Sequence, residues 1–485
     1  MQTGRDKMKI KINDRNATIF LIIAAVFLLA SPIIIKYIHT NSAVVGDDSY
    51  YNLRLINNVF SKENSIKDGF VERSNFATPY HFLMKLVGNY FNIEIAAEVF
   101  QLILGLCALM LFYAILTNFK VNLIVKFLSS IILILSPAYI WTFATINPFG
   151  LSIVCLLTAI YGYLSNDARW NSASFALFLL LMFFGITSAV TSIAVLISLI
   201  FLKKNMAKKI RTVLVLSIAL FAILIIIYIY FGGLPQKTYE INPFKFLISD
   251  FGSLIGFGIF EFILLIYGII LTWKMKKEFV PTYISIAILS IFGFYMGSYV
   301  NSYISFIAAV FAAIGFGFMI KRKWEMTTIK NLTILVLFCG LLFSTISYIN
   351  RLSNSLPDEK IIDSLVWLKS ASNEGDVIFS DSSRGLWIEY FSERKVLLDD
   401  KFIFIKNADN RFKDSSKIFY SRNLKETREL LNKYEVKYIF IDESMKKGIV
   451  WNEEQEGLLF LFRNPETFKN IYLKDGIEIW EYIGK

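Results

Sequence analysis

The residues best suited to chemistry lie in a short stretch, residues 45–54, with the sequence Val-Gly-Asp-Asp-Ser-Tyr-Tyr-Asn-Leu-Arg. It contains adjacent carboxylates, Asp47 and Asp48, and it follows the first long apolar run by about ten residues. A carboxylate at a lipid–water boundary can act as general base toward an acceptor hydroxyl, or hold a divalent cation that bridges a lipid phosphate. The alternative is an ordinary polar loop whose tyrosines, Tyr50 and Tyr51, lie at the membrane interface.

Two more residues near this stretch are candidates. Arg54 is placed to contact a phosphate or to pair with a nearby acid, and the sequence favours neither reading. His81 is one of only two histidines, and a lone histidine is more often a structural or interfacial residue than a catalyst. Because Asp47 and Asp48 are neighbours, an extended backbone points their side chains in different directions, so one can face a site while the other anchors the loop.

Composition indicates a membrane protein. The chain has 485 residues and is 55% hydrophobic, above the level of a soluble domain. The net charge is +11, but the basic residues lie in short clusters between apolar runs, which indicates membrane topology rather than nucleic-acid binding. Cys107, Cys155 and Cys339 all lie inside apolar runs, so they form no disulfide framework in a water-exposed domain.

Apolar runs near the length of a membrane-spanning helix repeat along the first 350 residues. We predict about eleven spans: 17–36, 97–117, 122–141, 145–164, 172–185, 187–202, 212–231, 253–273, 281–297, 300–320 and 331–349. The spans carry few ionisable residues, chiefly Lys126 and Glu261 near predicted ends, whereas transporters place such residues at mid-membrane depth. A solute carrier or pump is therefore disfavoured.

The distribution of Lys and Arg predicts how the chain crosses the membrane. These residues collect at the N-terminus and in the loops after the second, fourth, sixth, eighth and tenth spans, all on one side. By the positive-inside rule that side is cytoplasmic. We therefore predict a cytoplasmic segment, 1–16, a transmembrane domain, 17–350, with a large first outer loop, 37–96, and an extracytoplasmic domain, 351–485.

The last segment has a charged, mixed composition. Helical spacing covers 361–369 and 424–434, and short strand-like pieces lie at 377–380, 395–398, 437–442 and 477–482. Strands that alternate with helices predict a small α/β domain, long enough for its own core. Within the first outer loop, an interfacial helix is predicted to begin near Pro79, because proline is favoured in a first helical turn.

These residues carry a resemblance to a known family. Asp48-Ser49-Tyr50-Tyr51-Asn52-Leu53-Arg54 resembles the first-loop motif of the oligosaccharyltransferase catalytic-subunit family of archaeal or bacterial type, which reads Asp-Pro-Tyr-Tyr-Asn-Tyr-Arg or a close variant. That family belongs to the GT-C superfamily of membrane glycosyltransferases, which take sugars from polyprenyl-phosphate carriers on the outer face. The tail segments 365–369, 375–380, 385–388 and 394–399 are similar to the opening of the family's outer domain.

The resemblance implies roles for particular residues. Asp48, and after it Asp47, would be the catalytic acids nearest the sugar phosphate and acceptor, with Asp48 as a ligand of Mg²⁺ or Mn²⁺. The implied substrate-binding residues are Tyr50, Tyr51, Arg54 and Asp250, the last as the acid of a later outer loop. His81 is a further substrate-binding candidate, outside the motif.

The chain also departs from the family pattern. The family's acceptor-reading motif, Trp-Trp-Asp-Tyr-Gly, should fall where residues 380–385 read Ser-Asp-Ser-Ser-Arg-Gly. Here Asp381 and Arg384 are expected on a solvated surface loop. The family's second acidic pair is missing from the loop 145–150, which leaves a metal site poor in ligands.

We therefore predict an integral membrane glycosyltransferase of GT-C type in the cytoplasmic membrane. It would transfer a sugar from a polyprenyl-phosphate-linked donor to a glycan, lipid or protein acceptor at the outer face. Two alternatives stay open. One is a divergent oligosaccharyltransferase that modifies protein asparagine. The other is a catalytically silent paralogue that binds lipid-linked glycan.

Overall fold

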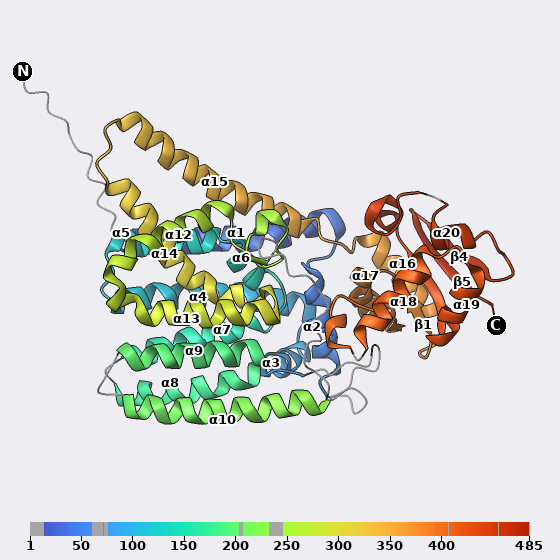
Figure 1. Cartoon of the computed structure of the whole chain (residues 1–485), viewed down its shortest axis with the longest axis horizontal. Helices are drawn as coiled ribbons and strands as arrows, with labels where there is room; N and C mark the ends of the chain where they lie inside the picture. The colour runs from blue at the N-terminus through green and yellow to red at the C-terminus, as the bar shows by residue number, and fades with distance from the viewer. Residues whose placement is uncertain are drawn as a thin grey trace, which may run out of the picture.

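Helices form one end of the molecule and a mixed α/β domain the other, as the computed structural model shows (Figure 1). The structure describes residues 14–60, 71, 76–165, 167–202, 207–231, 246–405, 407–453 and 455–484. The basic residues before Asp14, together with Lys203 and Lys204, lie outside the described residues.

Each predicted span contains helix. The helices of the bundle are α1 (Asp14–Thr40), α4 (Ile93–Asn118), α5 (Leu123–Leu135), α6 (Pro137–Ala144), α7 (Phe149–Leu164), α8 (Ala168–Leu180), α9 (Ile186–Leu202), α10 (Ala207–Phe231), α12 (Ile259–Thr272), α13 (Lys276–Met296), α14 (Asn301–Lys321) and α15 (Thr327–Ser353). Within the described residues, five helices are long and apolar enough to cross a membrane, or six if the bent α5–α6 pair counts as one span. Helix length therefore does not confirm the count of about eleven.

The third predicted span is broken rather than straight. Helices α5 and α6 meet at an angle of 62°. Proline at position 137 lacks an N–H and disfavours helical geometry at Ser136, whose ψ of 127° is extended. The break frees backbone groups inside the bundle, and the Thr345 hydroxyl donates to the Leu135 carbonyl at 2.6 Å.

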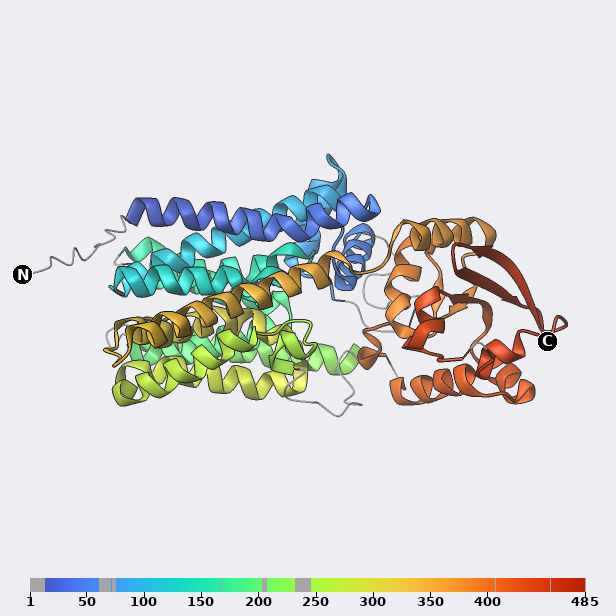
Figure 2. The same ribbon diagram turned by 90° about the horizontal axis from the view of Figure 1, so that it is seen from above.

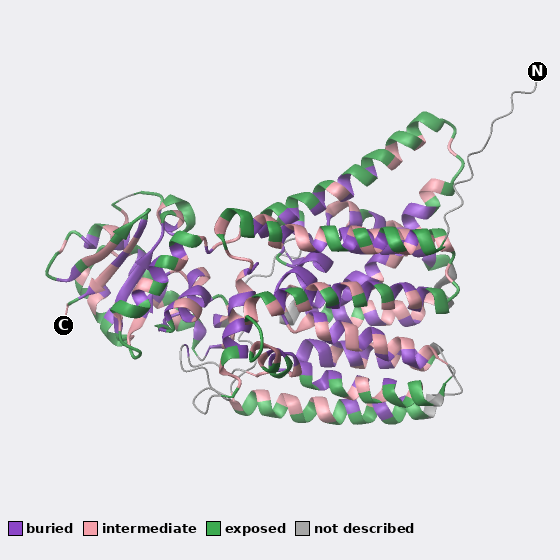
Figure 3. Cartoon of the chain, turned by 180° about the vertical axis from the view of Figure 1, so that it is seen from behind, coloured by how far each residue is buried: buried purple, intermediate pink, exposed green. Residues whose placement is uncertain are grey.

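The outer surface of the bundle is apolar, as expected for contact with lipid. On α10, for example, Ile218, Ile223, Ile226 and Ile229 are all exposed (Figure 3). The turns between α4 and α5, α12 and α13, and α14 and α15 lie together at the end of the bundle far from the α/β domain (Figure 1). These turns contain Lys120, Lys274 and Arg322 from the basic clusters of the sequence.

The C-terminal domain is built on a five-stranded sheet in the order β2-β1-β3-β5-β4. Strands β1 (Val377–Phe379), β2 (Lys395–Val396) and β3 (Val436–Ile441) are parallel, whereas β5 (Ile477–Tyr482) is antiparallel to β3 and to β4 (Phe468–Lys474). The helices and turns are α16 (Glu359–Ala371), α17 (Ser382–Trp387), η6 (Ile388–Ser392), η7 (Phe402–Phe404), α18 (Ala408–Tyr420), α19 (Leu424–Lys433), η8 (Met445–Ile449) and α20 (Gly457–Leu461). The predicted strands and helices are all present, while β4, α17, α18 and α20 were not predicted.

Two short helices of the first outer loop lie where the bundle meets this domain (Figures 1 and 2). Helix α2 (Asp47–Asn58) contains the acidic stretch, and α3 (Pro79–Gly88) begins at the predicted proline. The segments after β1 and β2 reach α2, with α17 and η6 packed against it. The carboxyl ends of parallel strands are the usual place for functional loops in α/β sheets, and here they face the bundle.

Candidate active site

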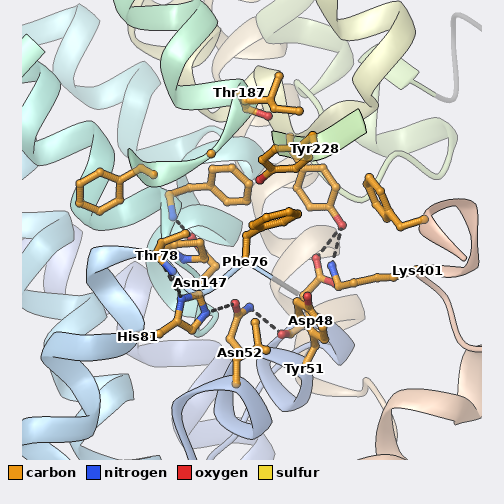
Figure 4. Close-up of a pocket in the computed structure, with 18 residues that line it drawn as sticks. Asp48, Tyr51, Asn52, Phe76, Thr78, His81, Asn147, Thr187, Tyr228 and Lys401 are labelled. Atoms are coloured by element: carbon orange, nitrogen blue, oxygen red, sulfur yellow. Dashed lines mark hydrogen bonds and ion pairs between the residues drawn. The ribbon is translucent and has the colours of Figure 1, made fainter. Parts of the chain in front are cut away.

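A cavity of about 190 Å³ lies between the bundle and the C-terminal domain (Figure 4). Its walls come from α2, from α3 and the segment before it, from the loop between α6 and α7, and from the end of η1 (Leu181–Phe184) with the start of α9. Residues of α10, η5 (Ser298–Val300) and the segment after β2 complete them. Its polar lining includes Asp48, His81, Tyr299 and Lys401. The cavity therefore brings together residues that lie more than 300 positions apart in the sequence.

Asp48 is fixed at one end of this cavity by two partners. Its Oδ1 lies 2.7 Å from the Lys401 Nζ, and its Oδ2 accepts a hydrogen bond of 2.9 Å from the Tyr299 hydroxyl. Lys401 Nζ also lies 3.3 Å from the Tyr299 oxygen and sits over the Tyr51 ring, 4.8 Å from its centroid. Burial alone would lower the pKa of Lys401, but Asp48, Tyr299 and Tyr51 raise it overall, so the amine stays protonated.

Asp47 faces the C-terminal domain instead. Its Oδ1 accepts a hydrogen bond of 3.0 Å from the Trp387 indole N–H of α17. Burial raises the pKa of Asp47 to about 6, although the Trp387 hydrogen bond opposes the rise. The two acids do point in different directions, but they do so from the first turn of a helix rather than from an extended backbone.

His81 is a neutral structural side chain at the cavity wall. Its Nδ1 accepts from the Thr78 backbone N–H at 3.0 Å, so its Nε2 carries the proton that binds the Asn52 Oδ1 at 3.1 Å. Burial lowers the pKa of His81 to about 3. The side chain therefore presents a fixed tautomer to the cavity and holds α3 against α2.

Arg54 and Tyr50, predicted as substrate-binding residues, attach α2 to the C-terminal domain. The Arg54 guanidinium lies 3.0 Å from the Glu389 carboxylate, with both side chains buried. Of the two readings of Arg54, the geometry matches pairing with an acid. Tyr50 is fully buried with its ring 5.5 Å from that of Tyr390 and 5.3 Å from that of Phe391. Neither residue lines the cavity.

Asp250 lies away from the cavity. It belongs to η3 (Ser249–Phe251), and its Oδ2 accepts from the Ile259 backbone N–H at 2.7 Å and from the Ser344 hydroxyl at 2.9 Å. These contacts cap the first turn of α12 and join it to α15. One oxygen of the carboxylate thus holds the helix start, and a role of Asp250 in substrate binding stays a prediction.

The segment 380–385, which we expected on a solvated loop, is buried at Ser380, Arg384 and Gly385. Arg384 is 3% exposed, and its Nε donates to the Asp442 Oδ2 at 2.7 Å. Asp381 caps α17 by accepting from the Ser383 backbone N–H at 3.1 Å. The expectation of a surface role for Arg384 was wrong, because the sequence gives no sign that Asp442, at the end of β3, lies beside it.

Asn147 occupies the loop where the family's second acidic pair would fall. Its Nδ2 donates to the carbonyls of Thr142 and Thr145, and its Oδ1 accepts from the Phe149 backbone N–H at 2.9 Å. The Gln101 amide donates to the Asn147 carbonyl. The Asn147 side chain therefore caps α7 and shapes the cavity wall through backbone contacts.

The described residues do not fit a divalent cation. They contain no group of three or more His, Cys, Asp or Glu side chains arranged to hold a metal. Both oxygens of Asp48 are engaged, by Lys401 and Tyr299, and one oxygen of Asp47 accepts from Trp387. Mg²⁺ and Mn²⁺ need several oxygen ligands, so the implied metal site on Asp48 is not formed by these side chains.

Comparisons with known proteins bear on the fold. No protein-family model matches the chain, and no curated protein sequence matches it. Oligosaccharyltransferase from Archaeoglobus fulgidus, solved with a tethered acceptor peptide containing the NVT sequon, is similar with a TM-score of 0.61 and 12% identity, over 89% of this chain and 69% of that one. That oligosaccharyltransferase has also been solved in complex with zinc and sulfate.

Two further solved structures contain lipid phosphates. Archaeal oligosaccharyltransferase AglB from Archaeoglobus fulgidus, in complex with an inhibitory peptide and a dolichol-phosphate, has a TM-score of 0.59 and 13% identity, over 97% of this chain and 74% of that one. ArnT from Cupriavidus metallidurans, bound to undecaprenyl phosphate, has a TM-score of 0.52 and 11% identity, over 96% of this chain and 98% of that one. This chain therefore shares its fold with these solved structures: a polytopic helical membrane protein with a C-terminal α/β domain.

The sequence predicted the cavity residues of the first outer loop but not those of η5 and the C-terminal domain. Asp48, Tyr51 and His81 line it as predicted neighbours of a site. Lys401 and Tyr299 were not singled out. Lys401 lies just beyond the carboxyl end of the predicted strand 395–398, and the rule that parallel strands carry functional residues at that end would have pointed to it.

Proposed function

We propose that this protein is an integral membrane glycosyltransferase that transfers a sugar from a polyprenyl-phosphate-linked donor to an acceptor. The observation that carries the proposal is a pair of adjoining cavities, one with polar side chains near Asp48 and one that is apolar. One cavity is polar at Asp48, Tyr299 and Lys401. A second, apolar cavity of about 220 Å³ adjoins it, with Phe76, Thr78, Gly185 and Tyr228 lining both.

The apolar cavity suits the lipid part of such a donor. It is lined by side chains of η1 (Leu181–Phe184) and by Leu220, Ile223, Leu224 and Ile227 of α10. Helix α10 turns exposed apolar side chains outward, so a lipid chain can reach this cavity from the bilayer. Gly185 lines both cavities with a φ of +104°, a conformation that side chains disfavour.

The polar cavity suits the sugar and the reacting atoms. In the proposed reaction the acceptor oxygen forms the new bond to the sugar C1, while the bond from C1 to the phosphate oxygen breaks. The electron pair stays on that oxygen, so polyprenyl phosphate leaves. The Asp48 carboxylate takes the acceptor proton as general base and passes it to water. Arg54, Tyr50 and Asp47 support the step indirectly by attaching α2 to the C-terminal domain.

The same proposal includes the orientation of the chain. The turns that contain Lys120, Lys274 and Arg322 lie at the end of the bundle far from the C-terminal domain, so that end faces the cytoplasm by the positive-inside rule. Segment 1–16 is then cytoplasmic, helices within 17–350 span the cytoplasmic membrane, and 351–485 together with the cavities lies at the outer face.

Two narrower alternatives depend on specific observations. A divergent oligosaccharyltransferase would use the same cavities with a protein acceptor. However, the segment of the expected acceptor-reading motif holds Arg384 paired with Asp442 rather than an aromatic surface. A silent paralogue would bind lipid-linked glycan without turnover, and the engagement of both Asp48 oxygens favours that reading.

Sugar release from a radiolabelled polyprenyl-phosphate sugar by the purified full chain tests the proposal. The wild type is compared with Asp48→Asn, which keeps the shape of the side chain but removes its charge. Asp409→Asn on the exposed start of α18 is the matched control. We expect turnover by the wild type and the control, with a loss of about a hundredfold or more in Asp48→Asn. Binding of the donor without turnover by any variant would favour the silent paralogue. Equal turnover by all three would mean that the active site lies elsewhere.

A further inference from the structure

A phosphate-bearing donor needs a positive charge in its site, and the cavity offers one. Among the described residues that line it, Lys401 is the one side chain that carries a full positive charge, because His81 is held neutral by its hydrogen bonds. The amine reaches the cavity from the C-terminal domain and lies beside Asp48 (Figure 4). The inference below rests on the proposed function, since it concerns the lipid-phosphate donor.

The position of Lys401 is set by the groups around its amine. Asp48 lies at 2.7 Å and the Tyr299 hydroxyl at 3.3 Å, while the rings of Tyr51 and Tyr299 lie 4.8 and 5.3 Å from the nitrogen. Its side chain is only 15% exposed. At its base, the Lys401 backbone N–H donates to the buried Asp399 carboxylate at 2.9 Å. An ammonium has three N–H donors, and the contacts above use two of them.

This arrangement puts an ammonium where Asp48 would otherwise hold a metal ion. A divalent cation bound by Asp48 would lie beside the Lys401 ammonium, whose positive charge repels it, with no cluster of further ligands among the described residues. An ammonium and a divalent cation share one function toward a phosphate, which is to neutralise charge on its oxygens. Lysine binds phosphate as a point charge and needs no ligand set of its own.

We infer that Lys401 is a built-in cation that binds the phosphate of the lipid-linked donor in the place of a divalent metal. Negative charge grows on the phosphate oxygen as its bond to the sugar C1 breaks, and a nearby fixed ammonium stabilises that charge. Asp48 sets the position of this ammonium. Lys401 belongs to the C-terminal domain, so the site is complete only when that domain is docked on α2.

Binding of undecaprenyl phosphate tests the inference without requiring turnover. The full chain in lipid nanodiscs is titrated with undecaprenyl phosphate and, separately, with undecaprenol, which lacks the phosphate. Each titration is made with EDTA and with added Mn²⁺. The variants are Lys401→Met, Lys401→Arg and the double variant Asp48→Asn/Lys401→Met, which leaves no unpaired carboxylate. Lys413→Met, on the exposed face of α18, is the control.

We expect wild-type binding of the phosphate lipid to be the same in EDTA and in Mn²⁺. Lys401→Met and the double variant should bind it at least about tenfold more weakly, whereas Lys401→Arg and the control bind within about threefold of the wild type. Undecaprenol should bind equally to all, because a folding defect would weaken both lipids. Tight phosphate-lipid binding by Lys401→Met, or wild-type binding that requires Mn²⁺, would overturn the inference while leaving the proposed function standing. A wild type that binds neither lipid would overturn both.

Discussion

Breaking the buried Arg54–Glu389 ion pair is predicted to weaken the docking of the C-terminal domain on α2. The two groups are 3.0 Å apart with side-chain exposures of 6% and 0%, so water screens them little. At this distance and an effective dielectric constant near 20, their attraction is about 5 kcal/mol. Removal of one partner leaves the other charge buried, which typically costs about 3–5 kcal/mol. We therefore expect Arg54→Met to weaken docking by about this amount.

Hydrogen exchange measures this loss locally. We expect amides of α2 and η6 to exchange about a hundredfold to several thousandfold faster in Arg54→Met, since about 1.4 kcal/mol is a factor of ten. Arg463→Met, an exposed arginine of the same domain, is the control and should leave exchange unchanged. Arg54→Met/Glu389→Gln should recover much of the protection, because no charge is left buried. Unchanged exchange in Arg54→Met, or no recovery in the double variant, would refute the reasoning.

Three further predictions concern the other side chains around the site. Burial lowers the pKa of His81 to about 3. Between pH 6.5 and 3 the unfolded state therefore binds a proton at His81 and the folded state does not. The thermal midpoint of the wild type should then fall relative to that of His81→Gln as the pH drops from 6.5 toward 3, and parallel midpoints would contradict this. Burial raises the pKa of Asp47 to about 6, so the folded state keeps a proton that the unfolded state releases above pH 3.8. The wild type should lose stability relative to Asp47→Asn as the pH rises from 3.8 to about 6, with no further change above that window. Finally, Asp250→Asn should cost about 1 kcal/mol in unfolding free energy by weakening the cap of α12, without reducing donor turnover. A loss of turnover as large as that of Asp48→Asn would restore Asp250 to the site.

Much of the local structure follows from the sequence. Proline at position 79 starts α3 as predicted, because it fits a first helical turn and its missing N–H costs nothing there. The strand-like pieces of the tail form β1, β2, β3 and β5 because their apolar residues are buried in one sheet. These features depend on neighbours in the chain, which a sequence displays directly.

The features that the sequence left unpredicted depend on contacts between distant segments. Arg54 reads equally well as a phosphate ligand or an ion-pair partner until Glu389 is seen beside it, 335 positions later. Arg384 looks like a surface residue until Asp442 is found at 2.7 Å. Lys401 gains its role only when the segment after β2 reaches Asp48. The break at Ser136 is different, since the following proline was a local signal in an apolar run that resembles one span.

The measurement that tests the central claim most directly is photo-crosslinking of an undecaprenyl phosphate that carries a diazirine on the isoprene unit next to the phosphate. After irradiation of the wild type in nanodiscs, mass spectrometry identifies the labelled peptides. We predict adducts on η1, on α10 near Tyr228 and on Phe76–Thr78, lost when unlabelled undecaprenyl phosphate is added in excess. Adducts confined to other lipid-facing helices, such as α1 and α15, or labelling that excess lipid does not reduce, would contradict the account.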